Sequence, residues 1–283
     1  EIIMKTLNQL FKTYCEDREL YGKAKALDQT KGFYNNNIKR KLGKKKVDEI
    51  TEADVKAMFI KYTKDGHLSK ANKVLTIMRA VLKKAKLQHI IEDIAKHKEF
   101  ERERYLTPEE LQRVIKVLDK KAETPMKRPG VNFIKLLLYT GARKSEIANA
   151  TWGDLKGKYI VLKEHKTDNT NRDRKIFLNA SAMSIINSLE RKSDERKIIG
   201  IKDPKSLWQS VRDEAGVPDT VLHTLRHTFA SYGLKSKKVS LVEIGNLLGH
   251  KSLQSTKRYS HFADETSIEN AELVGEEIFK SIN

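Results

Sequence analysis

The sequence predicts a mostly α-helical protein with a small antiparallel β-sheet, divided into a helical N-terminal domain and a mixed α+β C-terminal domain. Apolar residues recur at helical spacing from Leu7 to His89. The pattern then breaks into a charged stretch, KHKEFERERY. Two β-rich runs further along the chain enclose a cluster of polar turn residues. At 283 residues the chain is long enough for two domains, each with its own core.

Four helices are expected before the charged stretch. The first has an apolar stripe formed by Leu7, Leu10, Phe11 and Tyr14. The second has a stripe formed by Leu27, Phe33, Tyr34, Ile38 and Leu42, and it ends at Gly43. Thr51 with Asp54 begins the third helix, and Ser69 begins a fourth that runs to about His89. Cys15, the only cysteine, lies in the first helix and is interpreted as a structural residue.

The domain boundary is predicted within the charged stretch, near residues 97–106. Thr107 then begins a new helix with two capping signals, because Glu110 completes a capping box and Pro108 takes the first helical position. We therefore expect a helical domain over residues 1–98, a linker over 99–106 and a mixed domain over 107–283.

A β-hairpin is predicted in the middle of the C-terminal domain. Its first strand alternates Tyr159, Val161 and Lys163 with Ile160, Leu162 and Glu164. Its second strand contains the run Ile176-Phe177-Leu178. Residues 167–171, TDNTN, lie between the strands and predict a turn. Lys166 precedes this cluster, at the mouth of the turn, where a long and flexible ammonium can reach a ligand.

Three helices are expected toward the C-terminus. No Pro interrupts the segment from His223 to Lys235, so we predict a helix on which His223 and Arg226 share a face. Ser240 and Glu243 form a capping box at the start of the second helix.

Gly249 ends this second helix and leaves His250 at its C-terminal edge. Ser252 can cap one more short helix, which carries Tyr259. His250 and Tyr259 are thus expected on neighbouring turns of the chain.

Two arginines, two histidines and a late tyrosine form a set that chemistry on a nucleic-acid phosphodiester requires. The five residues are Arg143, His223, Arg226, His250 and Tyr259. Two guanidinium groups can bind the non-bridging oxygens of a phosphate, and two imidazoles can transfer protons near neutral pH. A tyrosine hydroxyl has an ordinary pKa of about 10 and becomes a usable nucleophile beside such cations and bases.

These residues lie in motifs that follow one another in a definite order. The motifs are TGAR-x-x-E, the Lys166-Thr167 pair of EHKT, H-x-x-R-H, L-G-H, and a tyrosine nine residues after the last histidine. Over roughly residues 105–262 the chain therefore resembles the tyrosine recombinases of the phage-integrase family. The resemblance implies a helical core-binding domain, a linker and a mixed α+β catalytic domain with a C-terminal docking segment at residues 264–283.

The resemblance also implies a role for each matched residue. Arg143 and Arg226 would hold the phosphate, and His250 would donate a hydrogen bond to it. His223 would accept or donate a proton near Tyr259, the nucleophile, which would leave a 3′-phosphotyrosine on the DNA.

Two further matches carry supporting roles. Lys166 would protonate the departing 5′ oxygen, and Glu146 would orient the first histidine of the family's motif. The lysine has neighbouring alternatives, which are Lys163, Arg172, Arg174 and Lys175.

The implied function is that of a site-specific DNA recombinase, the integrase of a phage, prophage or other mobile element. Three other interpretations are a type IB topoisomerase-like enzyme, a chromosome-dimer-resolving recombinase of the same family, and a non-catalytic DNA-binding protein that keeps the fold. The expected partners are double-stranded DNA, further copies of the chain in a synaptic tetramer, and an accessory DNA-bending protein.

The charge balance agrees with a DNA partner. The chain has 56 Lys+Arg against 38 Asp+Glu, a net charge of +18, and a pI near 9.7. Residues 1–100 carry a net +10, whereas residues 263–283 carry a net −5. The acidic segment also has an apolar stripe at helical spacing, which favours docking on a neighbouring protomer or packing on its own domain.

We expect no metal, cofactor or membrane partner. His223 and His227 lie four residues apart, but no H-E-x-x-H motif or carboxylate cluster accompanies them, and His227 is interpreted as a structural or supporting residue. The chain has no disulfide framework, signal peptide or apolar run of membrane-spanning length, which predicts a cytoplasmic location.

Overall fold

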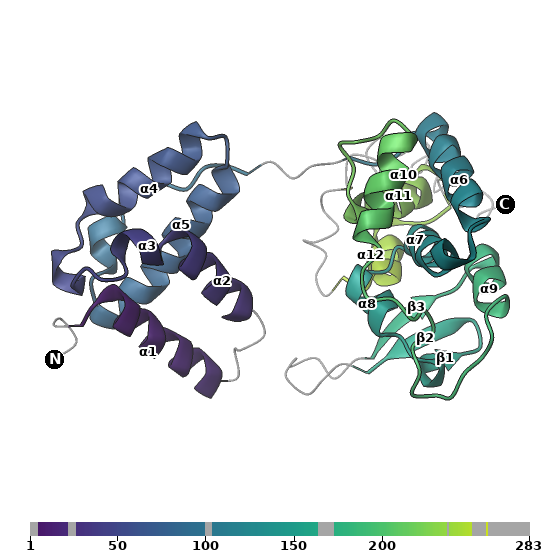
Figure 1. The fold of residues 1–283 in the computed structure, drawn as a ribbon, viewed down its shortest axis with the longest axis horizontal. Coiled ribbons are helices and arrows are strands. Elements are labelled where there is room, and N and C mark those ends of the chain that lie inside the picture. Colours follow the sequence, from purple (N-terminus) through teal and green to yellow (C-terminus); the bar gives the residue numbers. More distant parts are fainter. Residues whose placement is uncertain are drawn as a thin grey trace, which may run out of the picture. The chain divides into compact units, whose positions relative to one another are not determined.

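The chain forms two compact units, residues 1–100 and 101–283, and each is described by itself (Figure 1). The computed structural model describes residues 5–21, 27–99, 104–163, 173–236, 238–250 and 259. The units meet inside the charged stretch where the sequence predicts a boundary. The roles of core-binding domain, linker and docking segment stay predictions.

The N-terminal unit is helical. Its helices are α1 (Leu7–Leu20), α2 (Leu27–Asn37), α3 (Lys39–Leu42), α4 (Glu52–Lys64) and α5 (Leu68–Leu82). Helix α5 lies at the centre of this unit, where Val74, Leu75 and Met78 are fully buried against the other helices. The predicted first stripe is confirmed, because all four of its residues are buried on α1. Thr51 caps α4 as expected and accepts a hydrogen bond from the Asp54 N–H.

Two of the predicted N-terminal helices need correction. The fourth helix begins at Leu68 rather than Ser69, and it ends at Leu82. Two short 3₁₀ turns, Lys83–Ala85 and Gln88–Ile91, follow it, because the chain turns through a left-handed residue at Lys86.

The second predicted helix is two helices, α2 and α3, which are separated at Ile38. The break follows three consecutive asparagines, and the last of them, Asn37, donates to the Phe33 carbonyl and accepts from the Tyr62 hydroxyl. Such side-chain bonding competes with helical hydrogen bonding.

The C-terminal unit combines helices with one small sheet (Figure 1). Its helices are α6 (Pro108–Ala122), α7 (Arg128–Thr140), α8 (Lys144–Asn149), α9 (Ala180–Asn187), α10 (Lys205–Glu214), α11 (Leu222–Lys235) and α12 (Leu241–Leu248). Helix α7 packs against α6, α9, α10 and α11 and supplies much of the main core. Across the described residues, every helix is too short or too polar to cross a lipid bilayer.

The predicted hairpin is present, and the fold class is confirmed. Strands β2 (Tyr159–Leu162) and β3 (Arg174–Phe177) pair antiparallel, with Ile160 opposite Ile176 on the buried face. A third strand, β1 (Leu155–Lys156), pairs with β2 through a turn in which Gly157 has a φ of +61°. Two residues are too few to show alternation, which is why the sequence did not reveal β1.

A smaller hydrophobic cluster lies beside the main core of the C-terminal unit. It consists of Ala230, Leu234, Ile244, Leu248 and Tyr259. The cluster packs α12 against α11 and seats Tyr259 on both helices. The residues of the H-x-x-R-H and L-G-H motifs are carried by the same two helices.

Candidate active site

The TGAR motif forms a tight turn between α7 and α8. Gly141 has a φ of +64°, and a Cβ at this position would come within 2.5 Å of Phe229 and 2.8 Å of Leu248. Glycine is therefore required both for the left-handed conformation and for the close approach to α11 and α12. The turn places Arg143 at the start of α8, where 44% of its side chain is exposed.

Arg226 is the buried arginine of the site. The residue is 4% exposed, its Nη1 donates to the Gly141 carbonyl at 2.6 Å, and its Nη2 donates to the Leu248 carbonyl at 2.9 Å. Burial lowers the pKa of Arg226 to about 10, and the neighbouring charge of Arg143 adds to this effect. A guanidinium has five N–H donors, so the two bonds described here leave donors for a phosphate oxygen.

Glu146 connects two of the arginines. One carboxylate oxygen accepts from the Arg143 backbone N–H at 2.7 Å, and the other lies 3.0 Å from Arg143 Nη1 and 3.3 Å from Arg174 Nε. The carboxylate thus holds Arg143 close to a second guanidinium of the same charge. The expected role of Glu146 in orienting a histidine stays a prediction.

The Tyr259 hydroxyl contacts a histidine. Tyr259 is 5% exposed, and its hydroxyl lies 2.6 Å from Nδ1 of His227, which is also buried. The His223 ring meets the His227 ring edge-on, with 4.8 Å between their centroids. With Nδ1 of His227 unprotonated, the tyrosine donates this hydrogen bond, which is the geometry that proton removal needs.

His223 lines a pocket of about 300 Å³. Arg226 and Trp208 also line this pocket, and Lys144 and Lys205 bring positive charge to it. The predicted helical face is therefore present, because His223 and Arg226 border one concavity from the first turns of α11.

His250 follows the C-terminus of α12 as predicted. Ser240 and Glu243 form the capping box at the other end of this helix. Gly249 ends it with a φ of +66°, and the His250 N–H donates back to the Gly245 carbonyl at 2.9 Å.

Several predicted features lie outside the described residues. These are Lys166, the turn at residues 167–171, Arg172, the helix expected to start at Ser252, and the docking segment 264–283. Of the alternatives to Lys166, the structure describes Lys163, Arg174 and Lys175, and it describes Arg174 in contact with the site.

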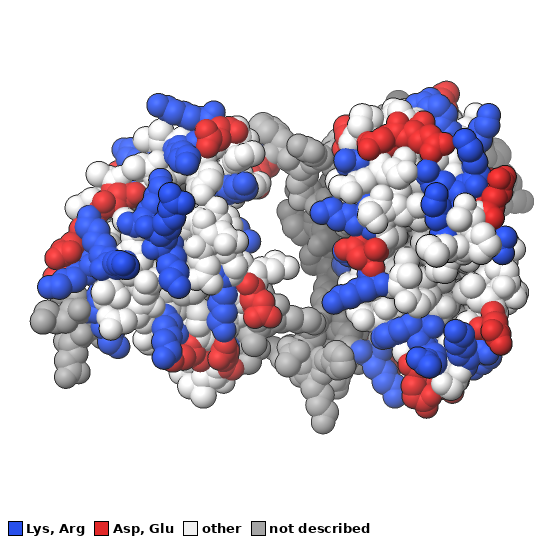
Figure 2. Space-filling view, viewed as in Figure 1, with Lys and Arg blue, Asp and Glu red and all other residues white. Residues whose placement is uncertain are grey.

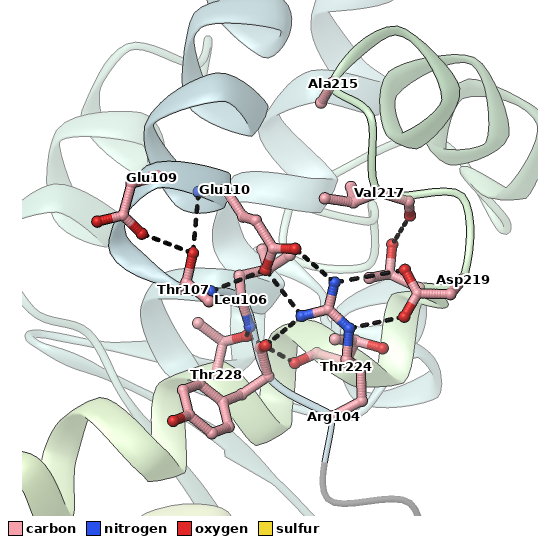
Figure 3. Close-up of polar contacts among 12 residues, drawn as sticks. Arg104, Leu106, Thr107, Glu109, Glu110, Ala215, Val217, Asp219, Thr224 and Thr228 are labelled. Carbon is pink, nitrogen blue, oxygen red and sulfur yellow. Dashed lines mark hydrogen bonds and ion pairs between the residues drawn. The ribbon is translucent and has the colours of Figure 1, made fainter.

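Residues of the predicted linker are tied to the C-terminal unit (Figure 3). Arg104 forms ion pairs with Glu110 at 2.8 Å and with Asp219 at 2.7 Å. Two residues later, the Leu106 N–H donates to Thr228 Oγ1 at 3.0 Å. Thr228 follows His227 on α11, so the start of the C-terminal unit is anchored on the helix that carries the site.

Comparison with known protein families identifies both units. The family described as "Phage integrase family" matches residues 104–266, more than half of the chain, and "Phage integrase central domain" matches residues 7–98. The chain belongs to the phage integrase family. Its relatives include a tyrosine recombinase XerC of Caldanaerobacter subterraneus, 27% identical over 56% of this chain, and the integrase of a Salmonella phage, 26% identical over 59%. These matches span 48% and 46% of the relatives, so the chain spans about half the length of the curated phage integrase relatives it matches.

Solved structures share the phage integrase fold with this chain. A lambda integrase tetramer bound to a Holliday junction aligns with a TM-score of 0.71 and 20% identity, over 90% of this chain and 77% of that one. The XerH recombinase bound to its difH substrate aligns with a TM-score of 0.58 and 19% identity, over 93% and 84% of the two chains. At such identities the likeness shows the fold alone.

Two described residues contact the predicted site residues although the sequence analysis gives them no definite role there. His227 is interpreted from the sequence as a structural or supporting residue, and its place in H-x-x-R-H puts it one helical turn from His223. Arg174 was one of four basic alternatives to Lys166, and only its contact with Glu146 distinguishes it.

Proposed function

We propose that this chain is a site-specific DNA recombinase, the integrase of a phage, prophage or other mobile element. One observation carries the proposal: two consecutive residues of α11 are placed for the two tasks of phosphoryl transfer. One task is to bind the phosphate, and the other is to activate the nucleophile. Arg226 is poised for the phosphate, and His227 lies 2.6 Å from the hydroxyl of Tyr259. The relatives include both an integrase and Xer recombinases, so a chromosome-dimer-resolving recombinase remains the second candidate.

The proposed reaction is a transesterification. The Tyr259 oxygen attacks the scissile phosphorus, the P–O5′ bond breaks, and a 3′-phosphotyrosine forms. The tyrosine proton passes to His227, or to His223 beside it, and a cation in the position expected for Lys166 protonates the departing 5′ oxygen. Attack by a 5′-hydroxyl on the phosphotyrosine reverses the step, so rejoining needs no external energy source.

Arg143 and Arg226 stabilise the transition state of this reaction. Charge builds on the non-bridging oxygens as the phosphoryl group transfers, and fixed cations that already face those oxygens lower the barrier. Arg143 is exposed and paired with Glu146, whereas Arg226 is buried and fixed by two carbonyls. The Arg143 side chain can therefore adjust its position when DNA binds, whereas the Arg226 side chain is held in one position.

The surface charge supports DNA as the substrate. Exposed lysines and arginines are spread over both units in the view of Figure 2, and the N-terminal unit presents a basic run around α3. The exposed members of this run are Lys39, Arg40, Lys41, Lys44 and Lys46. Neutralising phosphates with such residues releases counterions and drives association. Since the substrate is DNA of the cell or its mobile elements, we place the protein in the cytoplasm.

A covalent-capture selection tests this proposal without a known target. Nicked duplexes with a randomised core are incubated with the protein, so that a short downstream fragment diffuses away after attack and the covalent complex accumulates. The wild-type protein should capture a defined DNA sequence with the protein on the 3′ end, whereas Tyr259→Phe should bind the same DNA and capture none. Capture by Tyr259→Phe at the wild-type rate would refute the proposal.

A further inference from the structure

Arg174 is a nearly buried arginine that hydrogen-bonds to three protein groups. Its Nε lies 3.3 Å from Glu146 Oε1, its Nη2 donates to the Leu247 carbonyl at 3.0 Å, and its Nη1 donates to the Lys175 carbonyl. Only 10% of the side chain is exposed, against 44% for Arg143. Each of its three nitrogens contacts a protein acceptor, so Arg174 holds groups of α8, β3 and α12 together.

The charge of Arg174 is compensated by two elements. Burial lowers the pKa of its guanidinium, and the Glu146 carboxylate opposes this shift. The second compensating group is the C-terminus of α12, where unpaired carbonyls favour a nearby cation. A buried charge is stable only with partners of this kind.

Arg174 and Arg226 both donate hydrogen bonds to carbonyls at the C-terminal end of α12. Arg174 binds the Leu247 carbonyl, and Arg226 binds the next carbonyl, that of Leu248. Gly249 then turns the chain, and a Cβ at this glycine would come within 2.5 Å of Arg174 Nε. The path of the backbone into His250 is thus fitted around the Arg174 side chain.

We propose that Arg174 is a positioning residue for the phosphate site. It fixes the Glu146 carboxylate, which in turn holds Arg143, and it holds the end of α12 from which His250 emerges. It also ties β3, the strand that follows the Lys166 segment in the sequence, to α8 and α12. The proposal rests on the proposed function, because the phosphate in question is that of the DNA backbone.

Arg174→Gln tests the proposal in three measurements. Adduct formation on DNA selected by covalent capture should slow by about 10- to 100-fold, as for loss of groups that orient reacting residues, while binding of a single half-site stays unchanged. The defect should shrink when the scissile phosphate is replaced by a neutral methylphosphonate, because this substrate needs less cationic stabilisation from Arg143. Combining Arg174→Gln with Glu146→Gln should slow cleavage no further than the slower single variant, because both changes break one chain of contacts.

Arg113→Gln is the matched control. Arg113 on α6 donates from Nε to the Ala215 carbonyl at 2.8 Å, so it also binds a helix-terminal carbonyl, but outside the site. This variant should cleave both substrates at the wild-type rate. If Arg174→Gln does not fold, Arg174→Lys offers one ammonium for three acceptors and should show the same substrate dependence.

The outcomes separate this proposal from the proposed function. A wild-type rate for Arg174→Gln, or an equal defect on phosphate and methylphosphonate DNA, would overturn the positioning role while leaving the recombinase intact. Additive losses in the double variant would also overturn it. If the wild-type protein forms no adduct on any DNA, the proposed function fails and this proposal fails with it.

Discussion

Burying the Arg226 guanidinium costs folding free energy, and the same buried cation is proposed to bind the phosphate. Taking a guanidinium out of water is unfavourable, and burial lowers the pKa of Arg226 to about 10, while the Gly141 and Leu248 carbonyls accept hydrogen bonds from it. On the proposed function, the negative charge of a bound phosphate would further compensate this buried cation.

Replacing either phosphate-binding arginine by lysine should abolish most cleavage. In Arg226→Lys a single ammonium cannot reach both carbonyls and a phosphate. In Arg143→Lys the planar guanidinium that pairs with Glu146 is lost. We expect each variant to form the covalent adduct on the order of a hundredfold more slowly. Timed adduct formation on a nicked substrate measures this, and near-wild-type rates would remove the residue in question from the site.

The proton acceptor can be identified from the pH dependence of cleavage. If His227 accepts the Tyr259 proton, it must be neutral to act, so wild-type cleavage should fall at acid pH. His227→Gln keeps a hydrogen-bond partner for Tyr259 but cannot take its proton, so it should cleave slowly and lose that acid limb. His223→Gln is the matched comparison. Loss of the acid limb in His223→Gln alone would assign the proton to His223, as the sequence resemblance implies.

The sequence predicts candidate site residues better than it predicts their contacts. The order and spacing of TGAR-x-x-E, H-x-x-R-H and L-G-H select Arg143, Arg226 and His250 as candidates, and their roles stay predictions. The pairing of His227 with Tyr259 could not be predicted, because it depends on a segment 32 residues further along the chain. Helical spacing shows which residues share a face and leaves open what that face meets.

At the scale of elements, capping signals predicted helix starts well. Thr51, Thr107 and Ser240 cap α4, α6 and α12 as expected, since each signal is local and complete within four residues. Helix ends were harder to predict, because the apolar pattern continues past the break at Ile38 and past the end of α5 at Leu82, where short 3₁₀ turns follow.

The ion pairs that Arg104 forms with Glu110 and Asp219 stabilise the start of the C-terminal unit in a pH-dependent way. Hydrogen bonding from Arg104 lowers the pKa of Glu110 below its ordinary value of 4.5. A carboxylate with a lowered folded-state pKa contributes stability above its unfolded pKa, and that contribution is lost as the pH falls through the folded value. Arg104→Gln should therefore reduce the free energy of unfolding by about 1–3 kcal/mol at pH 7.

The difference from wild type should shrink as the pH falls below 4.5, because a protonated Glu110 no longer pairs with Arg104. Urea titrations of both proteins across this range measure the effect. A difference that is constant with pH would show that the ion pair with Glu110 is not its source.

At the scale of the molecule, the predicted roles of the two units would separate DNA binding from chemistry. The N-terminal unit carries a large share of the positive charge, and the C-terminal unit carries the candidate site. The sequence predicted this division because a charged, non-periodic stretch separates two apolar patterns. It leaves open whether the C-terminal segment docks on a neighbouring protomer or on its own domain, because an apolar stripe does not identify the surface that covers it.

The acidic C-terminal segment is expected to join protomers. Deleting residues 266–283 should spare binding to a single half-site and abolish the higher-order complex on full sites, because the apolar stripe of this segment would dock on a neighbour. Native gel shifts on half and full sites measure this. A milder pair, Ile278→Asp and Phe279→Asp, should act in the same way, and normal assembly by the deleted protein would show that the segment packs on its own domain.

The most direct test of the central claim is to locate the covalent bond. After capture on a nicked duplex, the complex is digested with nuclease and trypsin and the peptides are analysed by mass spectrometry. We expect a 3′-phosphonucleotide on Tyr259, within the tryptic peptide from Tyr259 to Lys280. A nucleotide on any other residue, or a linkage to a 5′ phosphate, would contradict the assignment of Tyr259 as the nucleophile.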